Sequence, residues 1–193
     1  MCPQMVEGSR ILLITGARQV GKSTALRAAV EDMRHAGVRV SGLLTERTGP
    51  HDLAVTELVT GATYPLTESF VATPGSPTPH FTMKAEALAR SACALLNSFP
   101  TQLFVLDELG PLELKHRQGW VGAFELLAQE TYQVAVIVVR PELLGNAISE
   151  MPGTSFTVFN VTTTNRDAVP ALLGREIRAR LGSIPGAGRG MPL

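Results

Sequence analysis

Short continuous runs of aliphatic residues alternate along the chain with stretches in which apolar residues recur at helical spacing. Unbroken aliphatic runs are typical of parallel strands that are buried on both faces. The runs that predict strands cover residues 11–14, 38–44, 103–106, 134–139 and 156–161. We therefore expect an α/β fold, a three-layer sandwich in which a mostly parallel sheet is covered by helices on both faces.

Helical spacing is clearest in two segments that separate the predicted strands. The apolar positions are Ala85, Leu88, Ala89, Ala92, Leu95 and Leu96 in the first segment, and Val121, Phe124, Leu127 and Ala128 in the second. Both segments are expected to be helices that cross between parallel strands. Cys93 lies on the apolar side of the first pattern, which predicts a small core residue. Trp120 adjoins the second pattern and is expected to lie in the core or on partly covered surface rather than to stack on a base.

Two segments interrupt this rhythm. Residues 45–82 contain the aliphatic stretch 53–59, then Gly61 and a region dense in Pro, Thr and Ser, which predicts an inserted β-hairpin and loop and a place for a lid. Residues 182–193 are rich in glycine and lack periodicity, so we expect a disordered tail after a helix at about 168–181. The length of 193 residues favours a single domain over residues 1–181.

Composition excludes several classes of function. The 17 basic and 17 acidic residues balance, so no general electrostatic field attracts nucleic acid. The longest apolar runs are too short to cross a bilayer, and the first residues lack the pattern of a signal peptide. Two cysteines and four scattered histidines offer neither a disulfide framework nor the spacing of a zinc site. These features predict a cytoplasmic protein.

The strongest chemical signal follows the first predicted strand. The segment Gly16-Ala17-Arg18-Gln19-Val20-Gly21-Lys22-Ser23-Thr24 matches G-x-x-x-x-G-K-[ST], and a helical stretch from about 25 to 35 comes next. Glycines let backbone N–H groups turn toward phosphate oxygens, and the N-terminus of the helix adds a positive dipole end. In such a loop Lys22 reaches the terminal phosphates and Ser23 binds magnesium. The segment predicts a site for a nucleoside triphosphate with Mg²⁺.

A second acidic signal ends the aliphatic run 103–106, where Asp107 and Glu108 follow at the carboxyl edge of the predicted sheet. Asp107 is expected to hold magnesium, through water. Glu108 is expected to polarise a water molecule beside the terminal phosphate, a general-base role that favours hydrolysis. Together with the loop, the pair predicts a nucleoside-triphosphatase.

Several segments resemble a known family, the small P-loop nucleoside-triphosphatases, also called cancer-related nucleoside-triphosphatases and sometimes described as nucleotide kinases. The resemblance spans about residues 10–180 and rests on the phosphate loop, on 42–47, on 106–114 and on Val161-Thr162 with Asn165-Arg166-Asp167. It implies a RecA-like sheet and slow magnesium-dependent hydrolysis of ATP, GTP and other nucleoside triphosphates. Arg18 and Gln19 depart from the family, which usually has small residues or proline there.

Further candidates lie at the ends of other predicted elements. Arg140 ends the run 134–139, where its guanidinium is expected either to stabilise the terminal phosphate or to lie on the surface. Asn165 and Arg166 precede the last helix and are candidates to contact the base, while Asp167 is a candidate helix cap. Glu46 and Arg47 form either a hairpin ion pair or part of a substrate site.

Three functions remain open at this point. The leading hypothesis is a magnesium-dependent nucleoside-triphosphatase in which Lys22, Glu108 and Arg140 are catalytic and Ser23 and Asp107 hold the metal. The first alternative is a nucleoside or nucleotide kinase that transfers the γ-phosphate to a small acceptor. The second is a regulatory module gated by nucleotide, in which segment 45–82 changes order with the γ-phosphate.

Overall fold

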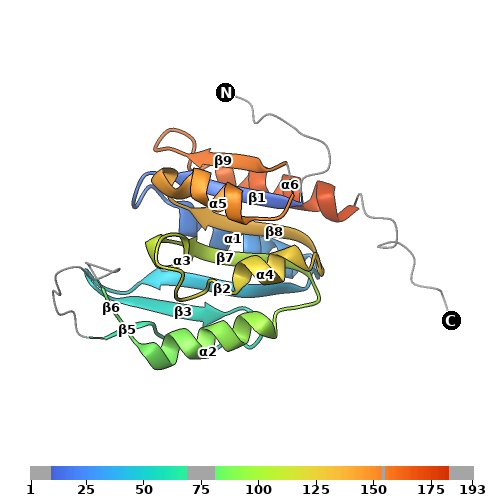
Figure 1. Ribbon diagram of the computed structural model, residues 1–193. Coiled ribbons are helices and arrows are strands. Elements are labelled where there is room, and N and C mark those ends of the chain that lie inside the picture. Colours follow the sequence, from blue (N-terminus) through green and yellow to red (C-terminus); the bar gives the residue numbers. More distant parts are fainter. Residues whose placement is uncertain (1–9, 69–80, 154, 183–193) are drawn as a thin grey trace.

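A seven-stranded sheet forms the centre of the molecule (Figure 1). The computed structural model describes residues 10–68, 81–153 and 155–182. The strands of the main sheet are β1 (Ile11–Gly16), β2 (Val40–Arg47), β3 (Leu53–Glu57), β4 (Thr63–Pro65), β7 (Thr101–Leu109), β8 (Tyr132–Val139) and β9 (Thr157–Val161), in the order β4-β3-β2-β7-β8-β1-β9. Two short strands, β5 (Thr67–Glu68) and β6 (Thr82–Met83), pair separately. All five strands predicted from aliphatic runs are confirmed.

Helices cover both faces of this sheet (Figure 1). Helix α1 (Lys22–His35) packs beside α6 (Val169–Gly182) on one face. The other face carries α2 (Ala85–Leu96), α3 (Pro111–Leu114), α4 (Ala123–Ala128) and α5 (Leu144–Glu150), the last preceded by a 3₁₀ turn, η1 (Pro141–Leu143). In the part of the chain that the structure describes, no helix is both long and apolar enough to traverse a bilayer.

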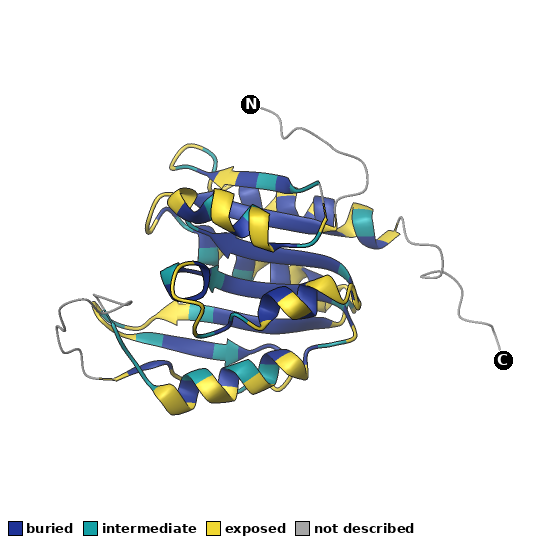
Figure 2. Cartoon of the chain, in the orientation of Figure 1, coloured by how far each residue is buried: buried dark blue, intermediate teal, exposed yellow. Residues whose placement is uncertain are grey.

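Strand β8 shows why the sheet needs cover on both sides. Val134, Val136 and Val138 pack with the core that α1 and α6 close. Ala135, Ile137 and Val139 point the opposite way, into the core beneath α2 to α5. Every side chain from 134 to 139 is buried, as the dark central strands of Figure 2 show. The predicted three-layer sandwich is confirmed.

The five strands β2, β7, β8, β1 and β9 run parallel, so their carboxyl ends meet at one edge of the sheet. The phosphate loop follows β1 at this edge. Asp107 and Glu108 lie near the end of β7, and Arg140 follows β8 directly. Because β8 lies between β1 and β7, Arg140 leaves the sheet between the loop and the acidic pair. Ligands of open α/β sheets bind at this edge.

The predicted insertion is built differently from a free-standing hairpin. β2 continues to Arg47, beyond the predicted end at Leu44, and pairs antiparallel with β3, which pairs with β4. The hairpin thus extends the main sheet, because the backbone groups of β2 find partners in β3. Most of the predicted loop, residues 69–80, lies outside the described residues. The predicted tail, 182–193, does so too except for Gly182, which ends α6.

The prediction for Cys93 is wrong, because its side chain is exposed on α2. The buried side of this helix is formed by Ala87, Ser91 and Leu95. Ser91 turns inward because its hydroxyl accepts a hydrogen bond from the indole Nε1 of Trp120, at 2.8 Å, and donates to the Ala87 carbonyl, at 2.8 Å. This polar contact rotates α2 away from the most apolar orientation. Trp120 is buried, as predicted.

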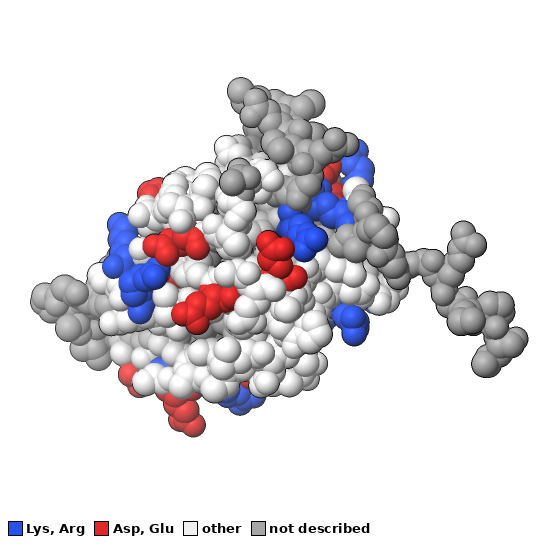
Figure 3. Space-filling view, turned by 45° about the vertical axis from the view of Figure 1, so that its right-hand side comes forward, with Lys and Arg blue, Asp and Glu red and all other residues white. Residues whose placement is uncertain are grey.

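Surface charge is mixed on the face shown in Figure 3. Among the described residues in that view, acidic and basic side chains are interspersed with broad uncharged areas, and neither sign forms one continuous surface. This distribution agrees with the even balance of 17 basic and 17 acidic residues.

Gly42 offers a test of how tightly β2 must approach β7. Its φ is +108°, and a Cβ atom there would lie 1.9 Å from the Val105 carbonyl oxygen. We expect Gly42→Ala to lower the free energy of unfolding by at least about 3 kcal/mol, because backbone cannot yield as a side chain can. Gly61→Ala is the matched control, since its φ is +74° but nothing lies within 4 Å. It should cost about 1 kcal/mol. Equal losses in urea unfolding would contradict this account.

Candidate active site

The loop between β1 and α1 encloses the side chain of its own lysine. Lys22 is the first residue of α1 and is buried. Its Nζ donates hydrogen bonds to the carbonyls of Gly16 and Ala17, each at 2.9 Å. Gly21 takes φ 111°, a left-handed conformation that lets the chain turn sharply into the helix. The ammonium group therefore already lies within the curve of the loop.

The hydroxyl of Ser23 joins this loop to the acidic strand. Ser23 Oγ donates to Asp107 Oδ1 at 3.1 Å, across 84 positions of sequence. Asp107 is fully buried, and within the described part of the chain its second oxygen, Oδ2, has no hydrogen-bond partner. Burial raises the pKa of Asp107 to about 7, and the charge of Glu108 also raises it. The Ser23 hydroxyl, the backbone of Thr45 and the charge of Lys22 lower it.

This pair of residues suits a divalent cation. A carboxylate oxygen buried without a partner is costly unless a cation or donor completes it. Mg²⁺ prefers hard oxygen ligands and binds through one or two carboxylates together with substrate phosphates. Asp107 and Ser23 supply such oxygens next to the phosphate loop. The donor set fits the metal that the sequence predicts.

Glu108 faces a different environment from Asp107, although the two are neighbours. Leu106 pairs with Ile137, and Leu109 pairs with Val139. Asp107 and Glu108 of β7 therefore oppose a single residue of β8, which forms a β-bulge that redirects their side chains. Glu108 thus lies at the open edge of the sheet and accepts a hydrogen bond from Arg140 Nε, at 2.5 Å. The predicted Arg140 is therefore brought directly to the predicted general base.

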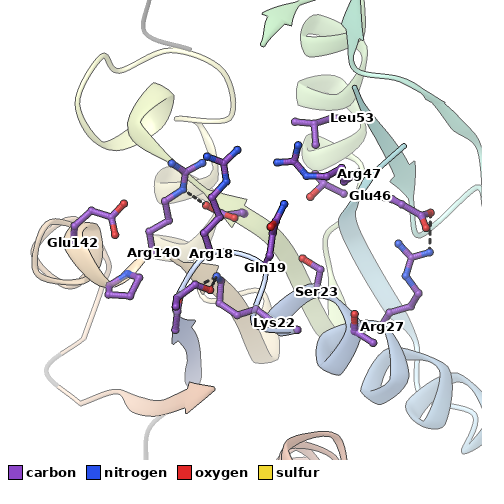
Figure 4. Close-up of a pocket in the computed structure, with 17 residues that line it drawn as sticks. Arg18, Gln19, Lys22, Ser23, Arg27, Glu46, Arg47, Leu53, Arg140 and Glu142 are labelled. Carbon is purple, nitrogen blue, oxygen red and sulfur yellow. Dashed lines mark hydrogen bonds and ion pairs between the residues drawn. The ribbon is translucent and has the colours of Figure 1, made fainter. Parts of the chain in front are cut away.

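Apart from Asp107, which is fully buried and reaches the site through Ser23, the site residues described above line one cavity of about 740 Å³ (Figure 4). Its walls come from the phosphate loop, the first turns of α1 and the ends of β2, β7 and β8, with Leu53 at the start of β3. Five cationic side chains line it: Arg18, Lys22, Arg27, Arg47 and Arg140. Three carboxylates face them: Glu46, Glu108 and Glu142. Cations outnumber acids, so the cavity favours an anionic ligand.

Glu46 and Arg47 do not pair with each other. Glu46 binds Arg27 of α1 at 3.1 Å. The Arg47 guanidinium lies 5.2 Å from the centre of the Phe81 ring and donates to the Pro50 carbonyl at 2.7 Å. Both side chains line the cavity, so the expected hairpin ion pair is wrong and the expected placement at a substrate site is supported.

Asn165 and Arg166 lie outside this cavity. Asn165 shapes the turn after β9, since its Oδ1 accepts from the Thr162 N–H and its Nδ2 donates to the Asn160 carbonyl, each at 2.8 Å. Arg166 passes beside the phosphate loop, with carbons 3.9 Å from where a Cβ on Gly21 would stand. Helix α6 begins at Val169, so Ala168 rather than Asp167 precedes it, and Asp167 is 98% exposed.

Comparison with known proteins decides the family. The family model described as NTPase matches residues 11–173. The chain belongs to this NTPase family. The predicted resemblance to small P-loop nucleoside-triphosphatases is thereby confirmed, and the chain is classed with the nucleoside-triphosphate hydrolases.

Curated relatives agree over most of their length. Nucleoside-triphosphatase THEP1 of Thermofilum pendens is 29% identical over 175 residues, which cover 86% of this chain and 93% of that protein. The protein of the same name from Methanosarcina acetivorans is 27% identical, covering 89% and 98%. The crystal structure of THEP1 from Aquifex aeolicus matches with a TM-score of 0.59 and 17% identity, over 86% of this chain and 98% of that one. This likeness supports the fold.

Sequence reasoning missed part of the cavity wall of this NTPase. Arg27 and Thr45 carry usable signals, since Arg27 lies four residues after Ser23 on α1 and Thr45 follows the buried run of β2 at the ligand edge. Glu142 follows Arg140 closely and has a similar signal. Leu53 has none, because its position depends on the register of the β2–β3 pair.

Asp107→Asn tests the cost of the buried carboxylate. The pKa of Asp107 is raised to about 7 because burial in the folded protein favours the neutral, protonated carboxyl. The free energy of unfolding of the wild type therefore falls as pH rises toward that value. Without metal at about pH 8, we expect Asp107→Asn to raise Tm by about 2–8 °C, and by less at about pH 5. Asp167→Asn, at an exposed carboxyl, is the control. A variant less stable than wild type at both pH values would contradict this.

Proposed function

We propose that this protein is a magnesium-dependent nucleoside-triphosphatase that hydrolyses ATP, GTP and other nucleoside triphosphates to the diphosphate and phosphate. The observation that carries the proposal is the Ser23–Asp107 hydrogen bond next to an unpartnered Asp107 oxygen, with Glu108 at the mouth of the same site. This arrangement offers a place for a metal-bound triphosphate and for an attacking water. A reducing cytoplasm is proposed as its location, because the sequence has two cysteines, too few for a disulfide framework.

Binding is proposed to rest on the loop from Gly16 to Thr24. Its backbone N–H groups and the N-terminus of α1 would contact the phosphates. This recognition does not depend on the identity of the base or the sugar. Lys22 exchanges the carbonyls of Gly16 and Ala17 for oxygens of the β- and γ-phosphates. Arg166, beside Gly21 but outside the cavity, is the candidate to contact the base, and Asn165 holds the turn that presents it.

The chemical step needs a base and charge neutralisation. Glu108 accepts a proton from the attacking water, whose oxygen bonds to the γ-phosphorus as the bond to the bridging oxygen breaks. Arg140 forms an ion pair with Glu108. When the γ-phosphate enters, it competes for the guanidinium, so Glu108 is released toward the water while Arg140 stabilises the phosphoryl group. Ser23 and Asp107 would hold Mg²⁺, which would supply Lewis-acid neutralisation of charge on the phosphate oxygens.

Phosphate release from ATP and GTP, with Mg²⁺ and no added acceptor, tests this proposal. We expect Lys22→Ala to abolish release through weakened binding, and Glu108→Gln to retain binding while lowering kcat by about 100-fold or more. Glu125→Gln, an exposed carboxylate on α4, is the matched control and should turn over normally.

Two outcomes would count against triphosphatase activity in this site. Normal turnover by Glu108→Gln would remove Glu108 from the mechanism. Tight binding of ATP by the wild type with no phosphate release would favour a kinase or a switch that awaits its partner.

One observation favours the kinase as the second candidate. The cavity extends past the phosphate loop to Thr45, Glu46, Arg47 and Leu53, residues that the proposed hydrolytic step does not use. A polar acceptor would fit between the loop and β2. Product analysis with a panel of nucleosides and nucleotides decides, since transfer yields a new phosphorylated product and hydrolysis yields only phosphate.

A further inference from the structure

Four of the five cations in the cavity already have partners within the protein. Lys22 donates to loop carbonyls, and Arg27 and Arg140 pair with Glu46 and Glu108. Arg47 is held by backbone carbonyls and by the Phe81 ring. Arg18 differs: its side chain is exposed and makes no hydrogen bond or ion pair with any residue in the described ranges.

Arg18 also has the position from which a γ-phosphate can be reached. It lies in the middle of the phosphate loop, directly before Gln19, whose φ of 61° marks the left-handed turn of that loop. In Figure 4 its side chain rises from the loop into the cavity, in the same direction as that of Arg140. The backbone on either side of Arg18 belongs to the site, since the Ala17 carbonyl accepts a hydrogen bond from Lys22 and Gly21 directly precedes α1.

None of the three carboxylates that line the cavity forms an ion pair with Arg18. Glu46 and Glu108 each pair with another arginine, and Glu142 lies more than 4 Å from it, outside ion-pair distance. An unpaired guanidinium that lines a cavity with a cationic excess is a site for an anion, and its planar fork matches two oxygens of one phosphoryl group. Figure 4 shows that Arg18 extends toward Arg140, which pairs with Glu108. A phosphate chain cradled by the loop would therefore meet Arg18 on the side where the proposed reaction places its terminal phosphoryl group.

We propose that Arg18 is a catalytic residue that contacts the terminal phosphoryl group, so that the phosphate loop itself supplies an arginine to the transition state. This inference rests on the proposed triphosphatase function and adds a role that the loop motif does not require. As water oxygen bonds to the γ-phosphorus, its proton passes to Glu108 and the electron pair of the broken bond goes to the β-phosphate. Charge shifts onto the bridging and γ oxygens, where a guanidinium stabilises it more than in the ground state.

Kinetics of Arg18→Ala and Arg18→Lys give the first test. We expect kcat to fall at least about 100-fold in Arg18→Ala, with KM within about threefold of wild type, because the contact is strongest in the transition state. Arg18→Lys should recover little activity, since an ammonium cannot form the two-pronged contact. Added guanidinium ion should partly restore Arg18→Ala. Arg175→Ala, at an exposed arginine on α6, is the matched control. Unchanged kcat, or a change in KM alone, would overturn the proposal.

Binding of a transition-state analogue separates this inference from the proposed function, because it needs no turnover. Wild type and Arg175→Ala should bind MgADP much more tightly when aluminium fluoride is added. Arg18→Ala should bind MgADP normally and lose that gain. If the wild type released no phosphate, the proposed triphosphatase function would be refuted. Binding of the analogue would still show whether Arg18 contacts the terminal group. If Arg18→Ala kept the full gain, Arg18 would not contact the terminal group. Its Tm should match wild type, because Arg18 has no partner to lose.

Discussion

The buried carboxylate of Asp107 is the constraint on which the rest of the site depends. Its one oxygen accepts from Ser23 and its other has no partner among the described residues, while burial raises its pKa to about 7. Such a group costs stability in the folded protein without a cation. The parallel sheet brings the other groups of the site to the same edge. The phosphate loop follows β1, the acidic pair lies on β7, and Arg140 follows β8, which lies between these two strands.

Around this fixed centre, the charged groups are arranged so that they can change partners. Arg27–Glu46 and Arg140–Glu108 are ion pairs between side chains that are only partly buried. Exposed pairs of this kind contribute little to stability, on the order of 0–1 kcal/mol, so a phosphate can displace them at small cost. Lys22 likewise holds only carbonyls. Most cations of the cavity thus have weak partners that a phosphate can replace, and the excess of cations over carboxylates favours an anion.

Much of this organisation can be predicted from the sequence because its signals are local. Aliphatic runs locate the parallel strands, and the phosphate loop and the Asp107-Glu108 pair follow from motif spacing. Features that depend on tertiary contacts escape such reasoning. Cys93 is exposed because the Ser91–Trp120 hydrogen bond sets the rotation of α2. The β-bulge that separates the environments of Asp107 and Glu108 appears only in the pairing with β8.

The contribution of Mg²⁺ to nucleotide affinity tests the central claim most directly. A non-hydrolysable ATP analogue is titrated calorimetrically into wild type and Ser23→Ala, with Mg²⁺ and with EDTA. The account predicts that Mg²⁺ lowers the Kd of wild type at least about tenfold, or about 1.4 kcal/mol, and that Ser23→Ala loses most of this gain. Equal affinity of wild type with and without Mg²⁺ would contradict the view that the Ser23–Asp107 pair is built for a metal-bound nucleotide.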